Sequence, residues 1–299
     1  MANPSGLHPK NKHKKKYDFS ILFDAHPTLK EFVFTNDYNT KTIDFANPKA
    51  VKELNRALLF TYYNLGYWEF PDSNLCPPIP GRVDYIHYVK DLLKQSNIKN
   101  VSILDIGTGA SCIYAILGNA EYGWKFVAAD IDKKSLEYAK QIIVKNGLDS
   151  QISLRYQKNK NHIFNGILKY NDKFSVTICN PPFYNSIADA KQENKRKNKG
   201  LDTGATQRNF AGVENELCYR GGEKAFLHTY LYESSQFKKQ CFWYTTLVSK
   251  KENVKPMYTS LEKLGATVIK TIPMHQGNKI TRIVAWTFLD EKEQKKWGF

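Results

Sequence analysis

The sequence has few cysteines, no long apolar run and no recognisable metal-binding spacing, and each shortage excludes a class of protein. Its five cysteines contain no C-x-x-C pair, so we expect reduced thiols rather than a disulfide framework or a zinc site. No stretch approaches the roughly 18 apolar residues of a membrane-spanning helix, and the basic N-terminus lacks the apolar core of a signal peptide. The seven histidines show no H-E-x-x-H spacing. We therefore expect a cytoplasmic protein with no membrane segment and no metal.

Acidic residues are also scarce. The 299 residues include 44 Lys and Arg against 29 Asp and Glu, which gives a net charge of +15, and aromatic residues make up 13% of the chain. A balance this basic favours a polyanionic partner, and the aromatic residues could provide stacking surfaces for bases. The alternative is a well-solvated surface over an ordinary aromatic core.

Two basic segments are candidate RNA-binding surfaces. Residues 8–16 contain basic side chains and no acid, and we expect a free arm that lies on phosphates, or alternatively a solvated tail. The second segment is a long polar stretch over 191–222, and loops of this length are usually functional or disordered. Its basic residues are Lys191, Lys195, Arg196, Lys197, Lys199 and Arg208.

The first 95 residues read as this arm followed by a helical extension. Asn47 and Pro48 are typical of a helix start. The proline-rich run 76–81 should not be helical until after Pro80, and Tyr85 and Val89 then mark a second helix. We therefore divide the chain into a basic arm and helical extension over 1–95 and a second domain over 96–299.

From residue 101 onward, apolar runs alternate with helical patterns, which is typical of parallel strands joined by crossover helices. We expect seven strands in an α/β fold with a mostly parallel sheet. The expected strands are 101–106, 126–129, 152–156, 174–179, 241–248, 266–272 and 282–288.

A glycine turn follows the first of these strands. Gly107 and Gly109 allow the backbone to come close to a ligand, but Cys112 stands where a dinucleotide-binding fingerprint would have its third glycine. Asp105 precedes the turn, and Asp130 ends the next strand, where it could accept both hydroxyls of an adenosine ribose. This pattern favours S-adenosylmethionine as the bound cofactor. The alternative is a generic Rossmann-like turn with a capping aspartate.

The sequence Asn180, Pro181, Pro182, Phe183 ends the fourth of these strands, because two prolines cannot continue a sheet ladder. The side-chain oxygen of Asn180 and the carbonyl of Pro181 could accept both hydrogens of a planar NH2 group. The lone pair of that nitrogen would then turn toward a methyl donor. Stacking of the base on Phe183 would contribute about 1–3 kcal/mol. The alternative is a plain strand-to-loop turn with a buried phenylalanine.

Several of these segments resemble one family of enzymes. The motifs are L-D-I-G-T-G-A-S-C-I-Y over 104–114, I-P-G-R over 79–82, G-L-H-P-K-N over 6–11 and N-P-P-F over 180–183. The chain resembles, over essentially its whole length, the bacterial 23S rRNA adenine-N6 methyltransferases, whose eukaryotic relative is the methyltransferase-like-sixteen enzyme. The resemblance implies a class I, Rossmann-like methyltransferase that uses S-adenosylmethionine.

The resemblance also assigns site residues. It implies that Arg82 reaches the methionine carboxylate of the donor and that Gly107 and Ser111 line the donor pocket. Asp130 matches the ribose-binding position, whereas Asn159 falls where a relative has threonine. Together with the patterns above, the donor-binding set comprises Arg82, Asp105, Gly107, Gly109, Ser111, Asp130, Asn159 and Asn180, and the catalytic set comprises Asn180, Pro181, Pro182 and Phe183.

The expected reaction is therefore methyl transfer to N6 of an adenine in 23S rRNA, either in free rRNA or in a large-subunit assembly particle, by a monomeric enzyme. Two alternatives stay open. A protein-glutamine methyltransferase could use the same N-P-P-F corner, although a peptide substrate needs no basic surface. An RNA-binding scaffold could keep the fold without turnover, although it would be expected to lose some of Asn180, Asp130 and the glycines.

Overall fold

The computed structural model describes residues 6–190 apart from 95 and 97, residues 192 and 212, and residues 214–297 apart from 277 and 278. Its centre is a seven-stranded sheet in the order β5, β4, β3, β6, β7, β9, β8. The first five strands of this order run parallel, and β9 is antiparallel to both of its neighbours. The strands are β3 (Ser102–Ile106), β4 (Lys125–Asp130), β5 (Ile152–Tyr156), β6 (Phe174–Cys179), β7 (Cys241–Val248), β8 (Val268–Gln276) and β9 (Lys279–Thr287).

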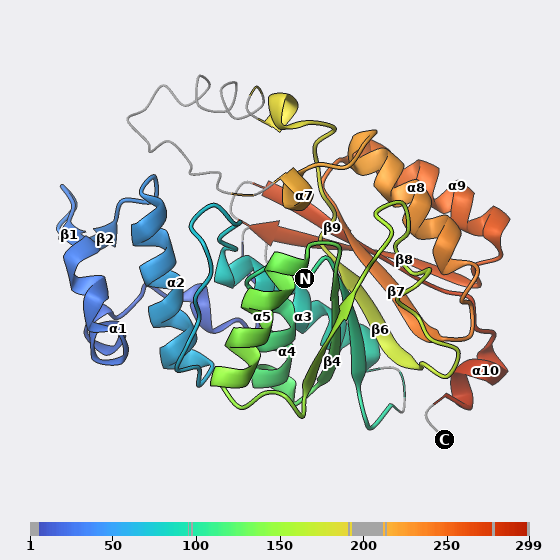
Figure 1. Cartoon of the computed structure of the whole chain (residues 1–299), viewed down its shortest axis with the longest axis horizontal. Coiled ribbons are helices and arrows are strands. Elements are labelled where there is room, and N and C mark those ends of the chain that lie inside the picture. The colour runs from blue at the N-terminus through green and yellow to red at the C-terminus, as the bar shows by residue number, and fades with distance from the viewer. Residues whose placement is uncertain are drawn as a thin grey trace.

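Helices cover both faces of this sheet (Figure 1). Alternate residues of one strand enter different cores: Ile103 lies in a buried cluster with α3, α4 and α5, and Leu104 lies in a second cluster with α8 and α9. This two-sided burial explains why the strands read as continuous apolar runs. The helices are α3 (Ile79–Leu93), α4 (Ile113–Tyr122), α5 (Lys133–Lys145), α8 (Gly222–Ser234) and α9 (Val254–Leu264). Among the shorter helices of this part of the chain are α7 (Glu214–Leu217), η3 (Lys251–Asn253) and α10 (Glu291–Lys295).

The predicted α/β fold is confirmed, and all seven expected strands are present with ends shifted by a few residues. The Asn47 cap is also present, because its Oδ1 accepts from the backbone nitrogen of Lys49 at 3.0 Å at the start of α2 (Pro48–Tyr62). The start of the next helix was predicted too late. Helix α3 begins at Ile79 and includes Pro80 in its first turn, where the missing N–H would have no intrahelical acceptor in any case.

The extension before α2 contains small elements that the sequence analysis did not predict. They are η1 (Lys12–Lys14), α1 (Phe19–Ala25), η2 (Pro27–Phe32), β1 (Val33–Thr35) and β2 (Lys41–Ile43). Buried Leu22 and Leu58 belong to the same cluster as Ile103 of the sheet, so the extension shares its core with the rest of the chain.

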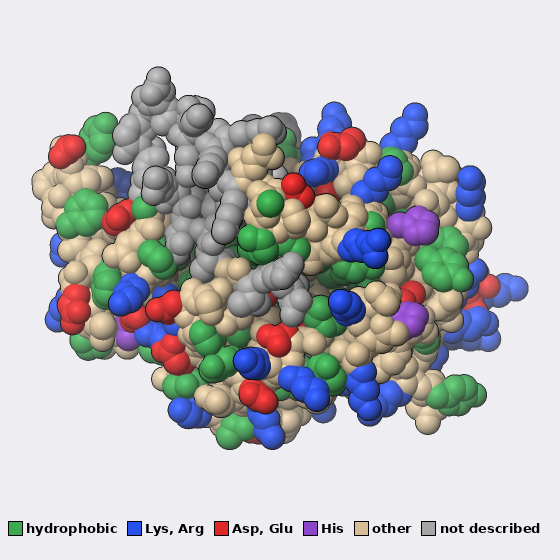
Figure 2. All heavy atoms as spheres, turned by 45° about the horizontal axis from the view of Figure 1, so that its top comes forward, with side chains coloured by type: hydrophobic (Ala, Val, Ile, Leu, Met, Phe, Trp, Pro, Cys, Tyr) green, Lys and Arg blue, Asp and Glu red, His purple; other side chains and the backbone are tan. Residues whose placement is uncertain are grey.

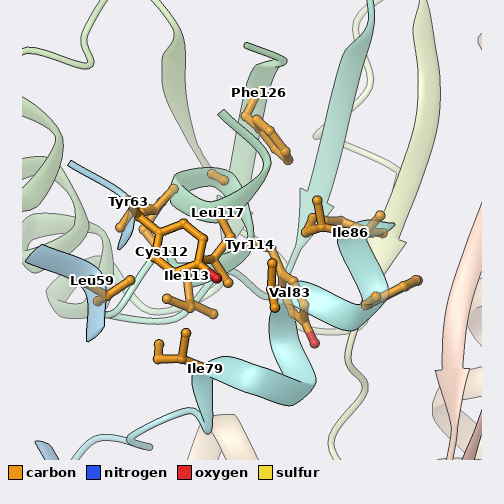
Figure 3. Packing of buried hydrophobic residues seen from close by; sticks show 14 of the residues in the cluster. Leu59, Tyr63, Ile79, Val83, Ile86, Cys112, Ile113, Tyr114, Leu117 and Phe126 are labelled. Carbon is orange, nitrogen blue, oxygen red and sulfur yellow. The ribbon is translucent and has the colours of Figure 1, made fainter. Parts of the chain in front are cut away.

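Figure 3 shows Ile79 and Val83 of α3 beside Ile113 and Tyr114 of α4. This packing fixes the first turn of α3, and with it Arg82, next to the sheet.

The basic segment 8–16 differs from the free arm that we expected, because it is docked on α3. The backbone nitrogen of His8 donates to Oδ1 of Asp84 at 3.0 Å, and Nε2 of His13 lies 2.7 Å from the hydroxyl of Tyr63. Burial lowers the pKa of His13 to about 4, so its ring is neutral at pH 7. The segment is therefore anchored by its histidines and Asn11. Lys10, Lys12, Lys14, Lys15 and Lys16 remain exposed.

All five cysteines are thiols that form no disulfide. Within the described part of the chain, no helix is both long enough and apolar enough to cross a membrane. The basic residues of the second candidate RNA surface, Lys191, Lys195, Arg196, Lys197, Lys199 and Arg208, lie outside the described residues.

Candidate active site

A pocket opens at the carboxyl ends of β3, β4 and β6, where parallel strands deliver their following loops to one edge of the sheet. Most of the predicted site residues meet there. The pocket is lined by Arg82, Gly107, Gly109, Ser111, Asp130, Asn180 and Pro182. The other predicted residues, Asp105, Asn159, Pro181 and Phe183, do not line it.

The glycine turn holds the backbone at the floor of the pocket. The amides of Gly107 and Thr108 donate to the carbonyl of Ala129 at 2.9 and 3.1 Å, which ties the turn after β3 to the end of β4. Gly107 and Gly109 have φ angles of +75° and +64°, a conformation that side-chain-bearing residues rarely adopt. The turn therefore exposes bare backbone to a ligand.

Asp130 at the end of β4 shapes this turn and faces the pocket. Its Oδ2 accepts from the amide of Gly109 at 2.8 Å, and its Oδ1 accepts from the amide of Asp132 at 2.9 Å. Burial raises the pKa of Asp130 to about 6, so the carboxylate is ionised at neutral pH. Each oxygen has a second lone pair, so the carboxylate can still accept two hydroxyl groups from a ligand.

Asp105 lies beneath the turn and is fully buried. By distance and angle, neither of its carboxylate oxygens accepts a hydrogen bond among the described residues. The nearby Thr108 side chain and Arg82 lower its pKa, but burial outweighs them and raises the pKa to about 7. An unpartnered buried carboxylate is costly, and a cationic ligand above it would lower that cost. The predicted donor carries a sulfonium and an ammonium group, so its charge fits this position.

Arg82 supplies a positive charge to the lining of the same pocket, close enough to Asp105 to lower the pKa of that carboxyl. It projects from the first turn of α3, and its Nη1 donates to the hydroxyl of Tyr114 at 3.2 Å. The guanidinium also lies over the Tyr114 ring, 5.6 Å from its centroid. Arg82 can therefore bind a carboxylate, while Asp105 and Asp130 suit an amine and a ribose. The residues present fit S-adenosylmethionine.

These raised pKa values predict a pH dependence of donor binding. A cationic ligand favours ionised Asp105 and lowers its pKa, so binding releases protons and should tighten as the pH rises through about 7. Asp105→Asn should weaken binding at pH 8 and flatten the profile between pH 6 and 8. Calorimetry in buffers of different ionisation enthalpy would measure the donor affinity at each pH and the number of protons released on binding. Titration of the donor's own amine affects both proteins equally, so it cancels in the comparison between them. Identical profiles for the two proteins would contradict the prediction.

The N-P-P-F corner stands beside the glycine turn. Ile106 pairs with Cys179 in the β3–β6 ladder, so Asn180 and Gly107 are the next residues of two neighbouring strands. Asn180 and Pro182 line the pocket, Pro181 is buried, and Phe183 is half-buried beyond the pocket wall. The corner therefore places one amide side chain in the same pocket as Asp130.

The sequence analysis missed one wall of the pocket, which Glu216 of α7 contributes. Oε2 of Glu216 accepts from the amide of Leu75 at 2.8 Å, and Oε1 accepts from Nδ2 of Asn74 at 3.1 Å. A Cβ at Gly109 would lie 3.4 Å from Oε1. No local pattern joins residues 74–75 to 216, so nothing in the sequence reveals this contact. Lys160, His162, Cys218 and Tyr219 also line the pocket and were also missed.

Asn159 lines a second depression, which adjoins the main pocket and shares Ile131, Gln157 and Lys160 with it. The side-chain Oδ1 of Asn159 accepts from the backbone amide of Asn161 at 3.0 Å, and the backbone amide of Asn159 donates to Oε1 of Gln157 at 3.0 Å. Asn159 thus shapes the loop after β5 outside the main pocket. Gln157 and Lys160 of this loop do line the main pocket.

The strand order defines a class I methyltransferase fold. The matching site is formed by the glycine turn after β3, the acid at the end of β4 and the N-P-P-F corner after β6. The comparison with family models narrows the class. The chain belongs to the RNA methyltransferase family, whose model matches residues 1–290. The resemblance inferred from the sequence is confirmed.

Curated relatives cover nearly the whole chain. A protein of Flavobacterium psychrophilum, named Ribosomal RNA large subunit methyltransferase F, is 50% identical over an alignment of 309 positions, gaps included, that covers 100% of this chain and 98% of the relative. The protein of the same name from Aeromonas salmonicida is 47% identical over 298 residues, covering 98% and 95% of the two chains.

Solved structures show the same architecture. The catalytic domain of human METTL16 in complex with hairpin 6 of the MAT2A 3′UTR aligns with a TM-score of 0.83 and 29% identity, covering 96% of this chain and 98% of that one. The N-terminal domain of human METTL16 in complex with SAH aligns with a TM-score of 0.77 and 29% identity, covering 95% and 100%. SAH is the demethylated form of the predicted donor, so this comparison agrees with the donor inferred from the sequence.

Proposed function

We propose that this protein transfers a methyl group from S-adenosylmethionine to N6 of an adenine in 23S rRNA. The observation that carries the proposal is that Asn180 shares one pocket with Gly107, Asp130 and Arg82. An amide acceptor for a planar NH2 group and a set of residues suited to the donor are therefore brought together. Bound S-adenosylmethionine supplies a methyl group activated on a sulfonium.

The donor-binding residues have distinct roles in this proposal. Asp130 accepts hydrogen bonds from the ribose hydroxyls, and Arg82 pairs with the methionine carboxylate. Asp105 balances the positive charge of the donor from below the turn. The glycine turn and Ser111 form part of the wall against which the donor lies.

On the acceptor side, Asn180 and Pro181 orient the base. The side-chain oxygen of Asn180 and the Pro181 carbonyl each accept one N–H of the adenine amino group, which turns the nitrogen lone pair out of the ring plane. Phe183 stacks on the base once the base enters. No strong base is required, because the methylated amine cation loses its extra proton readily to solvent or a nearby oxygen.

The choice of RNA over protein is supported by charge and by the relatives. The chain carries a net charge of +15, and five lysines of the docked arm are exposed. Its curated relatives are named as large-subunit rRNA methyltransferases, and one METTL16 domain was solved with an RNA hairpin. We further propose that the enzyme works as a monomer in the cytoplasm. Its substrate is free 23S rRNA or a large-subunit assembly particle. Residues 1–95 contribute RNA contacts, and residues 96–299 contribute most of the chemistry.

A labelling experiment separates this proposal from its two alternatives. Enzyme and donor with a labelled methyl group are incubated with deproteinised rRNA, with intact particles and with ribosomal proteins, all from a strain lacking the enzyme. Label in RNA is expected. Label in a protein glutamine would instead favour the glutamine methyltransferase, and no label in any substrate would favour the non-catalytic scaffold.

The arm lysines give a second test of RNA binding. Because His8, Asn11 and His13 hold the arm, changing Lys14, Lys15 and Lys16 to Ala should leave the fold intact. We expect weaker RNA binding and a salt slope lower by about 2, since each single-strand phosphate contact contributes about 0.7. Binding is measured by fluorescence anisotropy from low to high salt. The control changes three exposed lysines that do not line the pocket, Lys140, Lys263 and Lys295. Affinity equal to that of the control at every salt concentration would overturn the idea.

A further inference from the structure

A basic surface lies immediately beyond the N-P-P-F corner. It is formed by two chain segments, 219–224 at the start of α8 and 249–253 after β7. Buried Glu223 joins them: its Oε1 accepts from the amide and the hydroxyl of Ser249, both at 2.7 Å, and its Oε2 accepts from Nδ2 of Asn253 at 2.7 Å. Glu223 is only 2% exposed, so it fixes the two segments together without presenting its charge to solvent.

Four cations stand on these segments. They are Arg220, Lys224, Lys250 and Lys251, here called the basic ledge, and all four are exposed. Within the described parts of the chain, none of these four cations forms a salt bridge. Glu252 is the only exposed acid within segments 219–224 and 249–253, because Glu223 is buried. Figure 2 shows Lys and Arg side chains standing out over the region where Figure 1 places α8 and α9.

The ledge is connected directly to the corner. The amide of Tyr219 donates to the carbonyl of Tyr184 at 2.9 Å, and the amide of Gly221 donates to Oδ1 of Asn185 at 2.7 Å. A Cβ placed on Gly222 would lie 3.8 Å from the carbonyl oxygen of Phe183. The backbone that carries Arg220 and Lys224 therefore touches the residues that follow Asn180.

We propose that the basic ledge binds phosphates of the RNA strand that carries the target nucleotide. An adenine whose amino group reaches Asn180 must leave its base stack, so the backbone on at least one side of it has to be held. Unpaired cations on a rigid surface next to the corner suit that role, because phosphate contacts position a nucleic acid without reading its sequence. The inference rests on the proposed RNA substrate and assigns part of its binding site.

The test is a variant in which all four ledge residues are changed to glutamine, which removes charge but keeps the aliphatic stems. We expect a salt slope for binding deproteinised rRNA lower by about 3, at about 0.7 per phosphate contact. The KM for RNA should rise about tenfold or more near 0.15 M salt, while kcat at saturating RNA and the Kd of the donor stay within about twofold of wild type.

The matched control changes Lys99, Lys140, Lys263 and Lys295 to glutamine, because these exposed lysines lie away from the pocket and give the same loss of net charge. An equal loss of RNA affinity in the two variants would overturn the proposal, because the overall charge of the protein would then explain the effect. A defect on intact particles but not on deproteinised rRNA would also overturn it, in favour of an acidic protein partner. Methylation of rRNA by the wild-type enzyme is measured alongside, so failure of the ledge is distinguished from failure of the proposed function.

Discussion

Asn180→Ala should reduce methyl transfer by at least about 10³-fold while the donor still binds with a Kd within about twofold of wild type. Losing one polar group that stabilises a transition state costs about 10²–10³ in rate, and Asn180 also orients the amine. The effect should fall on kcat, because the donor is held by the glycine turn, Asp130 and Arg82. Single-turnover transfer of a labelled methyl group and calorimetry with the donor would measure the two quantities.

The conservative variant Asn180→Asp supplies the control. Its carboxylate keeps acceptor oxygens in the same place, so it should retain more activity than the alanine variant. The pKa of this new carboxyl is set by the same pocket, so activity is compared at several pH values. Turnover near the wild-type rate in Asn180→Ala would remove Asn180 from the catalytic role.

Asp130→Asn should weaken donor binding about 100-fold, or about 2.7 kcal/mol. The carboxylate is expected to accept hydrogen bonds from both ribose hydroxyls, and a hydrogen bond to a charged group contributes about 1.5–3 kcal/mol. The backbone N–H groups of Gly109 and Asp132 both donate to the Asp130 carboxylate. An asparagine side chain at this position would place its NH2 group against one of these two donors. Calorimetric titration with the donor at pH 8 is the measurement, since the carboxyl is then ionised.

Asp130→Glu is the matched variant for this prediction. It keeps the charge and the acceptor oxygens on a longer side chain, so it should bind the donor more tightly than Asp130→Asn does. A melting temperature measured without donor separates a loss of binding from a loss of fold. A Kd for Asp130→Asn within twofold of wild type would exclude Asp130 as the ribose ligand.

The sheet was predictable because its signals are local. A parallel strand buried on both faces reads as a continuous apolar run, and the residue after each run then falls at one edge of the sheet. This rule alone places Gly107, Asp130 and Asn180 at the same edge of the sheet. The helix start at Asn47 was equally local, because this cap accepts from the amides two and three residues ahead.

Contacts between distant segments were not predictable. His8 meets Asp84 across 76 residues and Glu216 meets Leu75 across 141, and no periodicity records either pairing. The docking of the basic arm and one wall of the pocket were therefore missed. The two three-residue strands of the N-terminal extension are too short to show an alternation of apolar and polar residues.

The residues of the pocket and the family resemblance support different parts of the proposed function. The chemistry of Asn180 and its neighbours specifies a planar NH2 acceptor, which an adenine or a glutamine could provide. The basic surface favours nucleic acid over a peptide. The choice of adenine N6 and of 23S rRNA comes from the family resemblance.

The most direct test is the identity of the methylated product. Large-subunit rRNA from a strain lacking the enzyme is incubated with enzyme and isotope-labelled donor, digested to nucleosides and analysed by mass spectrometry, with Asn180→Ala in parallel. We predict label in N6-methyladenosine at a single position, and none with Asn180→Ala. Label in another nucleoside, on a ribose or only in protein would contradict the assignment of this pocket to adenine N6.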